Sequence, residues 1–164
     1  MSQGNPHPWL LFIGGYKMIL PRTDTEITEK IIKSGIRPSI QRIQVYGFLC
    51  RNPIHPTVDT VYTALAPSIP TLSKTTVYNT LKLLAEHNLV QTITIENEEL
   101  RYDADTSNHL HFKCKKCNEV FDVHYSDTNH LYSLFEQQLP QGFKADKIQT
   151  CIWGTCSSCN STIE

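Results

Sequence analysis

The segment from Asn108 to Tyr125, NHLHFKCKKCNEVFDVHY, concentrates side chains that bind metal ions. Its candidate ligands are His109, His111, His124, Asp122 and the pair Cys114 and Cys117. Thiolates are soft ligands, whereas imidazoles and carboxylates suit harder divalent cations. The segment therefore serves either one ion with mixed ligands or two ions with different tasks.

The cysteines favour a separate structural zinc site. A second CxxC pair, Cys156 and Cys159, follows Cys117 after 38 intervening residues. Four thiolates from two such pairs form the closed tetrahedral site typical of structural Zn²⁺. Two disulfides or a redox CxxC are the alternatives, but the chain shows no secretion signal and the pairs match. Cys50 and Cys151 lie on apolar faces and are expected to be small core residues.

Zinc bound by four thiolates needs no further ligand, which leaves His109, His111 and Asp122 for another ion, whereas His124 is expected to be a surface or core histidine. His109 and His111 are two residues apart, so in a strand their side chains point to the same face. Imidazole and carboxylate ligands suit Fe²⁺, Mn²⁺ or Zn²⁺. An H-x-H pattern is also common on a solvated strand face. We interpret the segment as part of two metal sites.

Four helices are expected ahead of this segment. A capping box at Thr23-x-x-Glu26 opens the first, and Gly35 ends it. The others are expected over 39–51, from Pro56 and Thr57 to about Pro67, and over 73–88. The apolar period then changes to two, and residues 90–95 and 99–102 predict a β-hairpin. Helices followed by a hairpin predict a winged helix-turn-helix whose DNA-reading helix is 73–88.

The region after Asp103 predicts a smaller α/β unit. Residues 111–114 and 119–125 read as strands around the first CxxC, and 143–156 as a strand leading into the second. A helix over 128–139 carries an apolar stripe of Leu131, Leu134, Phe135 and Leu139. The fold class is thus expected to be α+β. The expected divisions are an extension (1–17), a DNA-binding domain (18–97), a hinge (98–106) and a dimerisation and metal-binding domain (107–164).

Charge divides along the same boundary. Residues 18–88 contain eight Lys/Arg against five Asp/Glu, and residues 89–164 contain six against eleven. A basic half joined to an acidic half suggests that the first binds a polyanion and the second binds cations. No stretch is apolar enough to span a membrane, and residues 1–17 lack the basic start of a secretory signal, so a cytoplasmic location is expected.

The chain resembles the ferric uptake regulator family of metal-dependent repressors. The resemblance rests on IRPSIQR (36–42), HPTVDTVYTAL (55–65), SKTTVYNTLKLL (73–84), RYD (101–103), H-x-H-x-x-C-x-x-C (109–117) and the closing CxxC. It implies a winged-helix domain, a C-terminal homodimerisation domain, a four-cysteine zinc site and a regulatory metal at the hinge. The regulatory ligands that it implies are His55, Asp103, His109, His111 and Asp122.

The resemblance also implies which residues meet double-stranded operator DNA. Exposed positions on the fourth helix are candidates for base and backbone contacts, with Tyr78 as the base-contacting tyrosine; the set is Lys74, Thr75, Thr76, Tyr78, Asn79 and Lys82. Candidates for phosphate contacts, which supply affinity rather than sequence choice, are Lys33, Arg37, Arg42 and Arg51. A solvated helix face is the alternative reading of these runs.

Within the family, the chain is similar to the peroxide-sensing branch, the PerR type. That branch has aspartates at the positions of Asp103 and Asp122, where iron-uptake regulators carry glutamates. Asn108 and Leu110 stand where iron-uptake regulators place ligands of an additional site. The branch implies that bound Fe²⁺ reacts with peroxide and that His55 or His109 gains an oxygen atom, whereas bound Mn²⁺ does not react.

Two other functions compete. An iron- or zinc-uptake repressor would use the metal reversibly as corepressor. A small non-haem metalloenzyme would need a general base and a substrate pocket, and no sequence signature of either is present. The sequence does not identify the operator, the target genes or the regulatory metal used in the cell.

Overall fold

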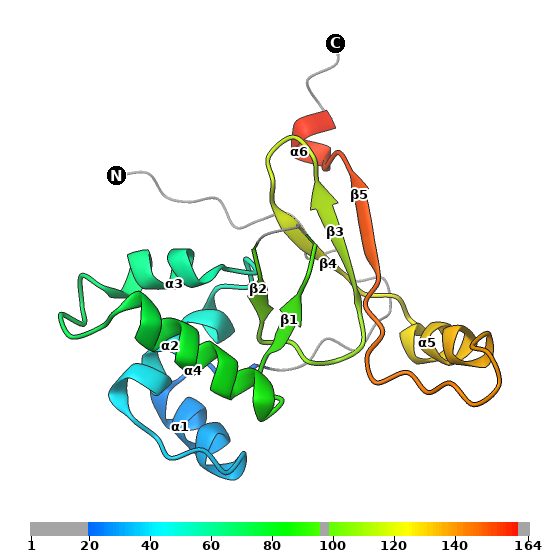
Figure 1. Ribbon diagram of the computed structural model, residues 1–164. Helices are drawn as coiled ribbons and strands as arrows, with labels where there is room; N and C mark the ends of the chain where they lie inside the picture. Colours follow the sequence, from blue (N-terminus) through cyan, green and yellow to red (C-terminus); the bar gives the residue numbers. More distant parts are fainter. Residues whose placement is uncertain (1–19, 96–98, 161–164) are drawn as a thin grey trace.

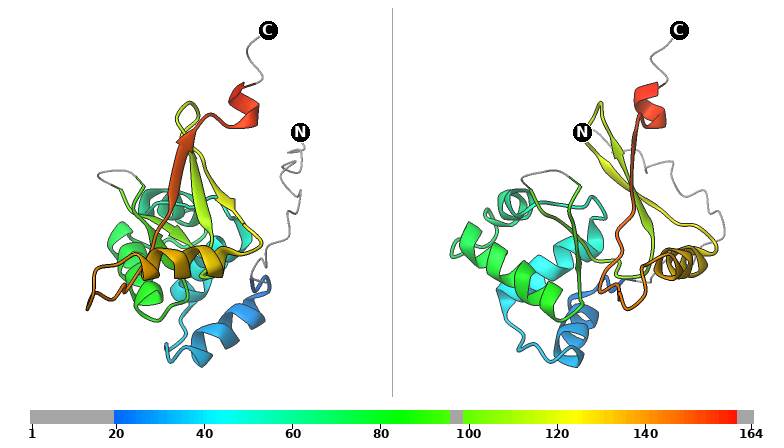
Figure 2. Two further views of the ribbon diagram at one scale, coloured as in Figure 1. Left: turned by 90° about the vertical axis from the view of Figure 1, so that its right-hand side faces the viewer. Right: turned by 45° about the vertical axis from the view of Figure 1, so that its right-hand side comes forward.

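The computed structural model describes residues 20–95 and 99–160, so the expected extension 1–17 lies outside the described residues. Four helices and a two-stranded sheet gather at one end (Figure 1). A three-stranded sheet rises from them, and a fifth helix lies at its lower end on the side away from the other four (Figure 2). The molecule is α+β, as predicted.

The helices α1 (Asp24–Lys33), α2 (Ile40–Arg51), α3 (Val58–Leu65) and α4 (Lys74–Glu86) begin alike. Each follows a hydroxyl residue whose side-chain oxygen accepts a backbone N–H of the first turn; these caps are Thr23, Ser39, Thr57 and Ser73. The predicted capping box is present, with Glu26 also accepting the backbone N–H of Thr23 at 2.9 Å. Gly35 adopts φ 79°, the left-handed conformation that glycine tolerates after a helix.

The helices enclose one apolar core. Ile27, Val45, Val61, Val77 and Leu81 supply fully buried side chains from all four helices. Tyr102 and Ala104, which follow the helices by many residues, belong to the same core. Burial of this apolar surface fixes the chain segment that enters the second half of the molecule against the helical half.

The predicted hairpin is present but shorter than expected. Strands β1 (Gln91–Ile93) and β2 (Arg101–Asp103) are antiparallel, with Gln91 opposite Asp103. The predicted turn at 96–98 lies outside the described residues. The pairing stops at Ile93 on the first strand, and Ile93 and Ile95 instead pack against Val120 of the next sheet. A small apolar seam therefore joins the hairpin to the C-terminal half.

The C-terminal sheet contains β3 (Leu110–Cys114), β4 (Val120–Val123) and β5 (Cys151–Gly154), in the order β4-β3-β5. Strands β3 and β4 are antiparallel, with His111 opposite Asp122. Strands β3 and β5 are parallel, and a parallel pair needs a crossover connection. Helix α5 (Thr128–Gln137) lies in that connection, and α6 (Ser157–Asn160) follows β5.

The apolar stripe predicted on α5 stays largely exposed in this chain. Leu134, Phe135 and Leu139 are 40%, 41% and 38% exposed. Tyr132 of α5 is buried, and its hydroxyl donates to the carbonyl of His109 at 2.9 Å. The helix is therefore fixed to β3 by a polar contact, and most of its apolar face is left open.

The helices found in residues 20–95 and 99–160 are all too short or too polar to cross a lipid bilayer.

Candidate metal centre

Five potential ligands from distant segments meet at one point between the two halves of the molecule. His55 lies shortly before α3, Asp103 ends β2, His109 immediately precedes β3, His111 lies on β3, and Asp122 lies on β4. One ligand atom from each lies within 4.8 Å of the ligand atoms of all the others. The structure thus brings together all five regulatory ligands that the resemblance implies.

The distances within this five-ligand cluster are short. His55 Nε2 lies 2.6 Å from Asp122 Oδ1, and His109 Nε2 lies 3.0 Å from Asp103 Oδ2 and 3.2 Å from Asp122 Oδ1. The Nε2 atoms of His109 and His111 are 3.0 Å apart. Three imidazole nitrogens and two carboxylates facing one point are the donors that divalent iron, manganese or zinc prefers.

Hydrogen bonds on the far side of two rings fix which nitrogen faces the cluster. His55 Nδ1 donates to the carbonyl of Val120 at 3.1 Å, and His109 Nδ1 donates to the carbonyl of Ser107 at 2.9 Å. A carbonyl only accepts, so both Nδ1 atoms carry a proton, and Nε2 is the atom of each ring that can bind a metal ion once it carries no proton. Metal-bound histidines use this arrangement, and the donor set therefore fits a divalent cation.

The backbone supports the unusual position of His55. Its φ is 50°, in the left-handed region that a residue with a side chain adopts infrequently. Arg101 Nη1 donates to the carbonyl of His55 at 3.3 Å, and Tyr102 N donates to the carbonyl of Pro56 at 3.0 Å. Hydrogen bonds from β2 thus stabilise the backbone that directs His55 toward the sheet. Local strain such as this positive φ is common at functional sites.

The charges of the cluster are strongly coupled. Burial opposes ionisation of Asp103, but hydrogen bonds from His109 and His111 hold the pKa of this carboxyl at about 2. Burial also opposes ionisation of Asp122, yet bonds from His109 and His55 keep its pKa well below the usual range. Burial disfavours a charged His109, but the two carboxylates raise its pKa to about 10. In the absence of an ion, a proton on His109 partly balances the carboxylates, and a metal must displace it.

The two CxxC pairs form a second cluster. The sulfur atoms of Cys114, Cys117, Cys156 and Cys159 all lie within 4.8 Å of one another, and all four are free thiols. The parallel register brings them together, because Cys114 at the end of β3 stands opposite Gly154, two residues before Cys156. The geometry matches the predicted structural zinc site rather than the disulfide alternative.

Backbone groups prepare the four-cysteine cluster for a cation. The backbone N–H groups of Cys117 and Cys156 donate to Cys114 Sγ and lower the pKa of that thiol to about 6. In contrast, hydrogen bonding with the Cys156 thiol raises the pKa of Cys159 to about 12. Four thiols cannot all ionise at this separation without a positive charge among them, and a Zn²⁺ ion would supply that charge.

The additional site of iron-uptake regulators has no ligands here at the two positions noted in the sequence. Leu110 is apolar and buried, and Asn108 Nδ2 donates to Asn129 Oδ1 at 3.0 Å. Two residues that sequence reasoning did not assign lie instead beside the five-ligand cluster: Asp105 and His124 form a further group with His109. His124 carried a signal, because it follows Asp122 by two residues on the same strand face.

The predicted DNA-reading face is open on α4. Lys74, Thr75, Tyr78, Asn79 and Lys82 are exposed, and Tyr78 has 47% of its surface accessible. Thr76 is only half-exposed, and its hydroxyl lies 2.8 Å from that of Ser73 at the cap. Lys74 Nζ lies 2.9 Å from Asp59 of α3, so its charge is partly neutralised.

The predicted phosphate-contacting residues differ in solvent exposure and in their hydrogen bonds. Lys33 and Arg37 are exposed, whereas Arg42 is half-buried and its Nη1 donates to the carbonyl of Arg37 at 2.6 Å. Arg51 forms an ion pair with Asp24 and donates to the carbonyl of Arg22, so it ties α2 to the start of α1.

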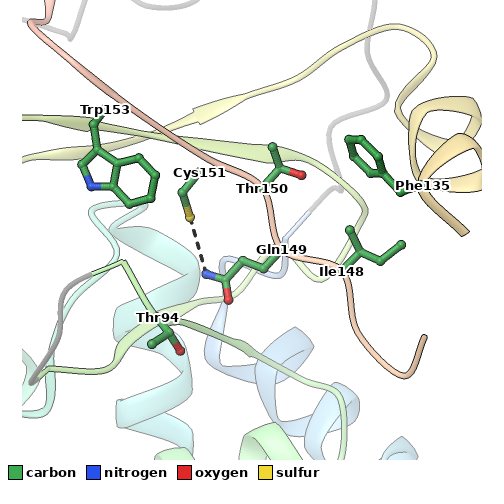
Figure 3. A pocket seen from close by; sticks show the side chains of 7 residues that line it. All are labelled: Thr94, Phe135, Ile148, Gln149, Thr150, Cys151 and Trp153. Atoms are coloured by element: carbon green, nitrogen blue, oxygen red, sulfur yellow. Dashed lines mark hydrogen bonds between the residues drawn. The ribbon is translucent and has the colours of Figure 1, made fainter. Parts of the chain in front are cut away.

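A surface hollow of about 480 Å³ lies between the hairpin and β5 (Figure 3). Its lining is Thr94, Phe135, Ile148, Gln149, Thr150, Cys151 and Trp153. Gln149 Nε2 donates to Cys151 Sγ at 3.8 Å. This lining holds no acid, base or cluster of metal ligands.

Comparison with known proteins gives a consistent result. The model of the "Ferric uptake regulator family" matches residues 33–150. The "Peroxide-responsive repressor PerR" of Staphylococcus epidermidis is 32% identical over 143 residues, which cover 85% of this chain and 94% of that protein. The "Peroxide operon regulator" of Bacillus subtilis is 33% identical over 135 residues, covering 82% and 92%. The crystal structure of the Campylobacter jejuni peroxide stress regulator superposes with a TM-score of 0.61 at 27% identity, covering 82% and 97%.

Proposed function

The chain belongs to the ferric uptake regulator family, and on that premise we propose that it is a repressor that senses peroxide through its five-ligand site. Members of this family are metal-dependent transcription regulators rather than enzymes; they bind operator DNA and dimerise. The peroxide-sensing function is the finer inference, and the site of this chain supports it.

One observation carries the proposal: the five ligands come from both halves of the molecule. His55 belongs to the helical half, and its Nε2 lies 2.6 Å from Asp122 Oδ1 of the C-terminal sheet. An ion held by both residues joins the DNA-reading helices to the sheet. We propose that this joint stabilises one orientation of the two halves, and that this orientation is the one that binds DNA.

Two features favour peroxide sensing over reversible metal sensing. Both carboxylate ligands are aspartates, Asp103 and Asp122, as in the peroxide-sensing branch. The two relatives named for their response to peroxide are 32% and 33% identical to this chain over more than four fifths of its length.

Individual histidines of the five-ligand cluster have distinct roles in the proposed sensing of peroxide. Ferrous ion, when bound, supplies the electrons that reduce hydrogen peroxide. All three histidines present Nε2 to the cluster, and the resemblance to the peroxide sensors singles out His55 and His109 as the imidazoles that gain the oxygen atom. An imidazole that has gained an oxygen atom donates more weakly. Loss of the His55 contact would free the helical half from the sheet and release DNA.

In this proposal, other parts of the molecule bind DNA, form the dimer and hold zinc. We propose that Tyr78 and the exposed positions of α4 read operator bases and that Lys33, Arg37 and Arg42 approach phosphates. We propose that a second copy of the chain covers the open apolar face of α5, forming a homodimer. The four-cysteine cluster holds structural Zn²⁺, which keeps its thiolates out of the sensing chemistry.

The test compares iron-loaded and manganese-loaded protein before and after a low dose of peroxide. DNA binding is measured by fluorescence anisotropy, and tryptic peptides are analysed by mass spectrometry. The proposal expects a gain of one oxygen on His55 or His109 together with loss of DNA binding in the iron form alone. Intact histidines with retained DNA binding would instead establish an uptake regulator that uses its metal reversibly. Oxidation confined to the cysteines would also contradict the proposal.

A further inference from the structure

Asp105, His109 and His124 form a third group of metal-binding side chains beside the five-ligand cluster. One potential ligand atom from each lies within 4.8 Å of the other two. His109 belongs to both groups, whereas Asp105 and His124 belong to the third group alone. The mixture of one carboxylate and two imidazoles suits the same divalent cations as the five-ligand cluster.

Asp105 is held in a position that suits a cation. The residue is 1% exposed, and its Oδ1 accepts from Ser107 N at 2.9 Å and Ser107 Oγ at 2.6 Å. Its other oxygen, Oδ2, is buried and has no hydrogen-bond partner among the described residues. A buried carboxylate oxygen without a partner is costly, and a cation shared with neighbouring imidazoles removes that cost.

His124 has the most exposed side chain of the two groups, since Asp105 is 1% exposed and the side chain of Asp122 is 12% exposed. The side chains of His55, His109 and His111 are 1%, 0% and 2% exposed, whereas that of His124 is 20% exposed. An ion that reaches the five-ligand cluster must shed its water within a nearly closed space. His124 borders that space, since its Nε2 is 3.9 Å from Asp122 Oδ2, and part of its ring reaches the solvent.

We propose that Asp105, His109 and His124 form an entry site, at which a divalent cation binds first before it moves to the five-ligand cluster. One ion occupies the two sites in turn. His109 Nε2 already faces the five-ligand cluster, and its Nδ1 donates to Ser107, so the ring has no second lone pair for another ion. The inference rests on the proposed metal site as the destination of the ion, and it does not depend on peroxide sensing.

An entry site predicts a distinctive kinetic result. Removing an intermediate binding site slows the uptake and the release of the ion by the same factor. The equilibrium affinity of the five-ligand cluster therefore stays unchanged. If Asp105 and His124 only supported the five ligands, their loss would weaken affinity and speed release. The two roles therefore differ in the direction of the release rate.

The experiment measures Co²⁺ uptake by zinc-loaded full-length protein in a stopped-flow spectrophotometer, and release into excess chelator. Asp105→Asn keeps the shape and the acceptor for Ser107, and His124→Gln removes the more exposed ligand. Both changes should slow uptake and release by at least about tenfold. The exposed residues Asp146 and His130 provide matched controls, since Asp146→Asn and His130→Gln should leave both rates unchanged.

A second measurement locates the ion at equilibrium. His55→Gln removes a ligand that the entry site does not use, so the remaining Co²⁺ binding should become sensitive to Asp105→Asn. Unchanged rates in both single variants, or faster release with weaker affinity, would overturn the entry site. Failure of the proposed metal site would show differently, as a Co²⁺ affinity that His55→Gln does not lower. That result would also overturn the entry site, because no destination would remain.

Discussion

His55 Nε2 and Asp122 Oδ1 lie 2.6 Å apart, although 67 residues separate them in the chain and each belongs to a different half of the molecule. His55 is attached to the helices through the turn before α3, and Asp122 is attached to the central strand β3 through its pairing with His111. The two residues thus join the two halves of the molecule at the five-ligand cluster, and in the proposed function a metal ion bound there would stabilise their relative position.

Replacing His55 should weaken both metal binding and DNA binding. We expect His55→Ala to weaken Mn²⁺ binding by at least about tenfold, since one of the five ligands is lost. DNA affinity at saturating Mn²⁺ should fall as well, because the helical half no longer holds the ion. Isothermal titration and anisotropy measure the two effects. His87→Ala is the control, and equal losses in both variants would contradict the assignment.

Replacing one cysteine of the four-cysteine cluster should release zinc. We expect Cys117→Ser to lower the bound zinc, measured by inductively coupled plasma mass spectrometry, and to lower the melting temperature, because zinc binding and folding of this unit are linked. Cys151→Ser, which changes a cysteine outside the cluster, should retain zinc. Full zinc content in Cys117→Ser would show that the four thiols do not act together.

Metal affinity should rise with pH. His109 has its pKa raised to about 10 in the metal-free cluster, so it carries a proton below that pH, and Mn²⁺ must displace it. The apparent affinity should therefore increase about tenfold per pH unit between about pH 6.5 and 8.5. Asp103, with a pKa of about 2, is ionised throughout this window and adds no proton. Titration calorimetry in buffers of different ionisation enthalpy should detect release of about one proton, and none would refute the prediction.

Two kinds of DNA contact should respond differently to substitution. We expect Tyr78→Ala to reduce the preference for operator over unrelated DNA by about 1–3 kcal/mol, and Arg37→Ala to weaken binding to all sequences and reduce its salt dependence. Anisotropy titrations at several salt concentrations distinguish the two. Tyr125→Ala, which changes an exposed tyrosine of the C-terminal half, is the control. Unchanged operator preference in Tyr78→Ala would exclude α4 as the reading helix in the orientation described.

Much of the fold was predictable because its signals are local. The caps Thr23, Ser39, Thr57 and Ser73 lie within a few residues of the helices that they begin, and the change of period after the fourth helix marks the hairpin. The pairing of β3 with β4 follows from the short connection between them. Strand lengths were less predictable, because Ile95 leaves the hairpin to pack against Val120, a contact that no local pattern encodes.

The metal site was predictable only in part from the residues. Spacing placed His109, His111 and Asp122 together, but His55 and Asp103 entered through the family resemblance, since their approach depends on tertiary packing. Asp105 was missed because its bonds to Ser107 resemble those of an ordinary turn. The exposed stripe of α5 shows a related limit: an amphipathic pattern predicts that a face is covered, without stating which chain covers it.

The parallel pairing of β3 with β5 also determines the order in which this half can fold. Cys114 pairs with Gly154 across a long crossover that includes α5, and contacts between such distant residues form slowly because loop closure must precede them. The second CxxC pair reaches the first only after that closure. Until then β3 presents an unpaired edge, which invites association with other chains during synthesis. Because the proposed Zn²⁺ would hold the closed arrangement together, we expect zinc scarcity to cause aggregation before it causes loss of DNA binding.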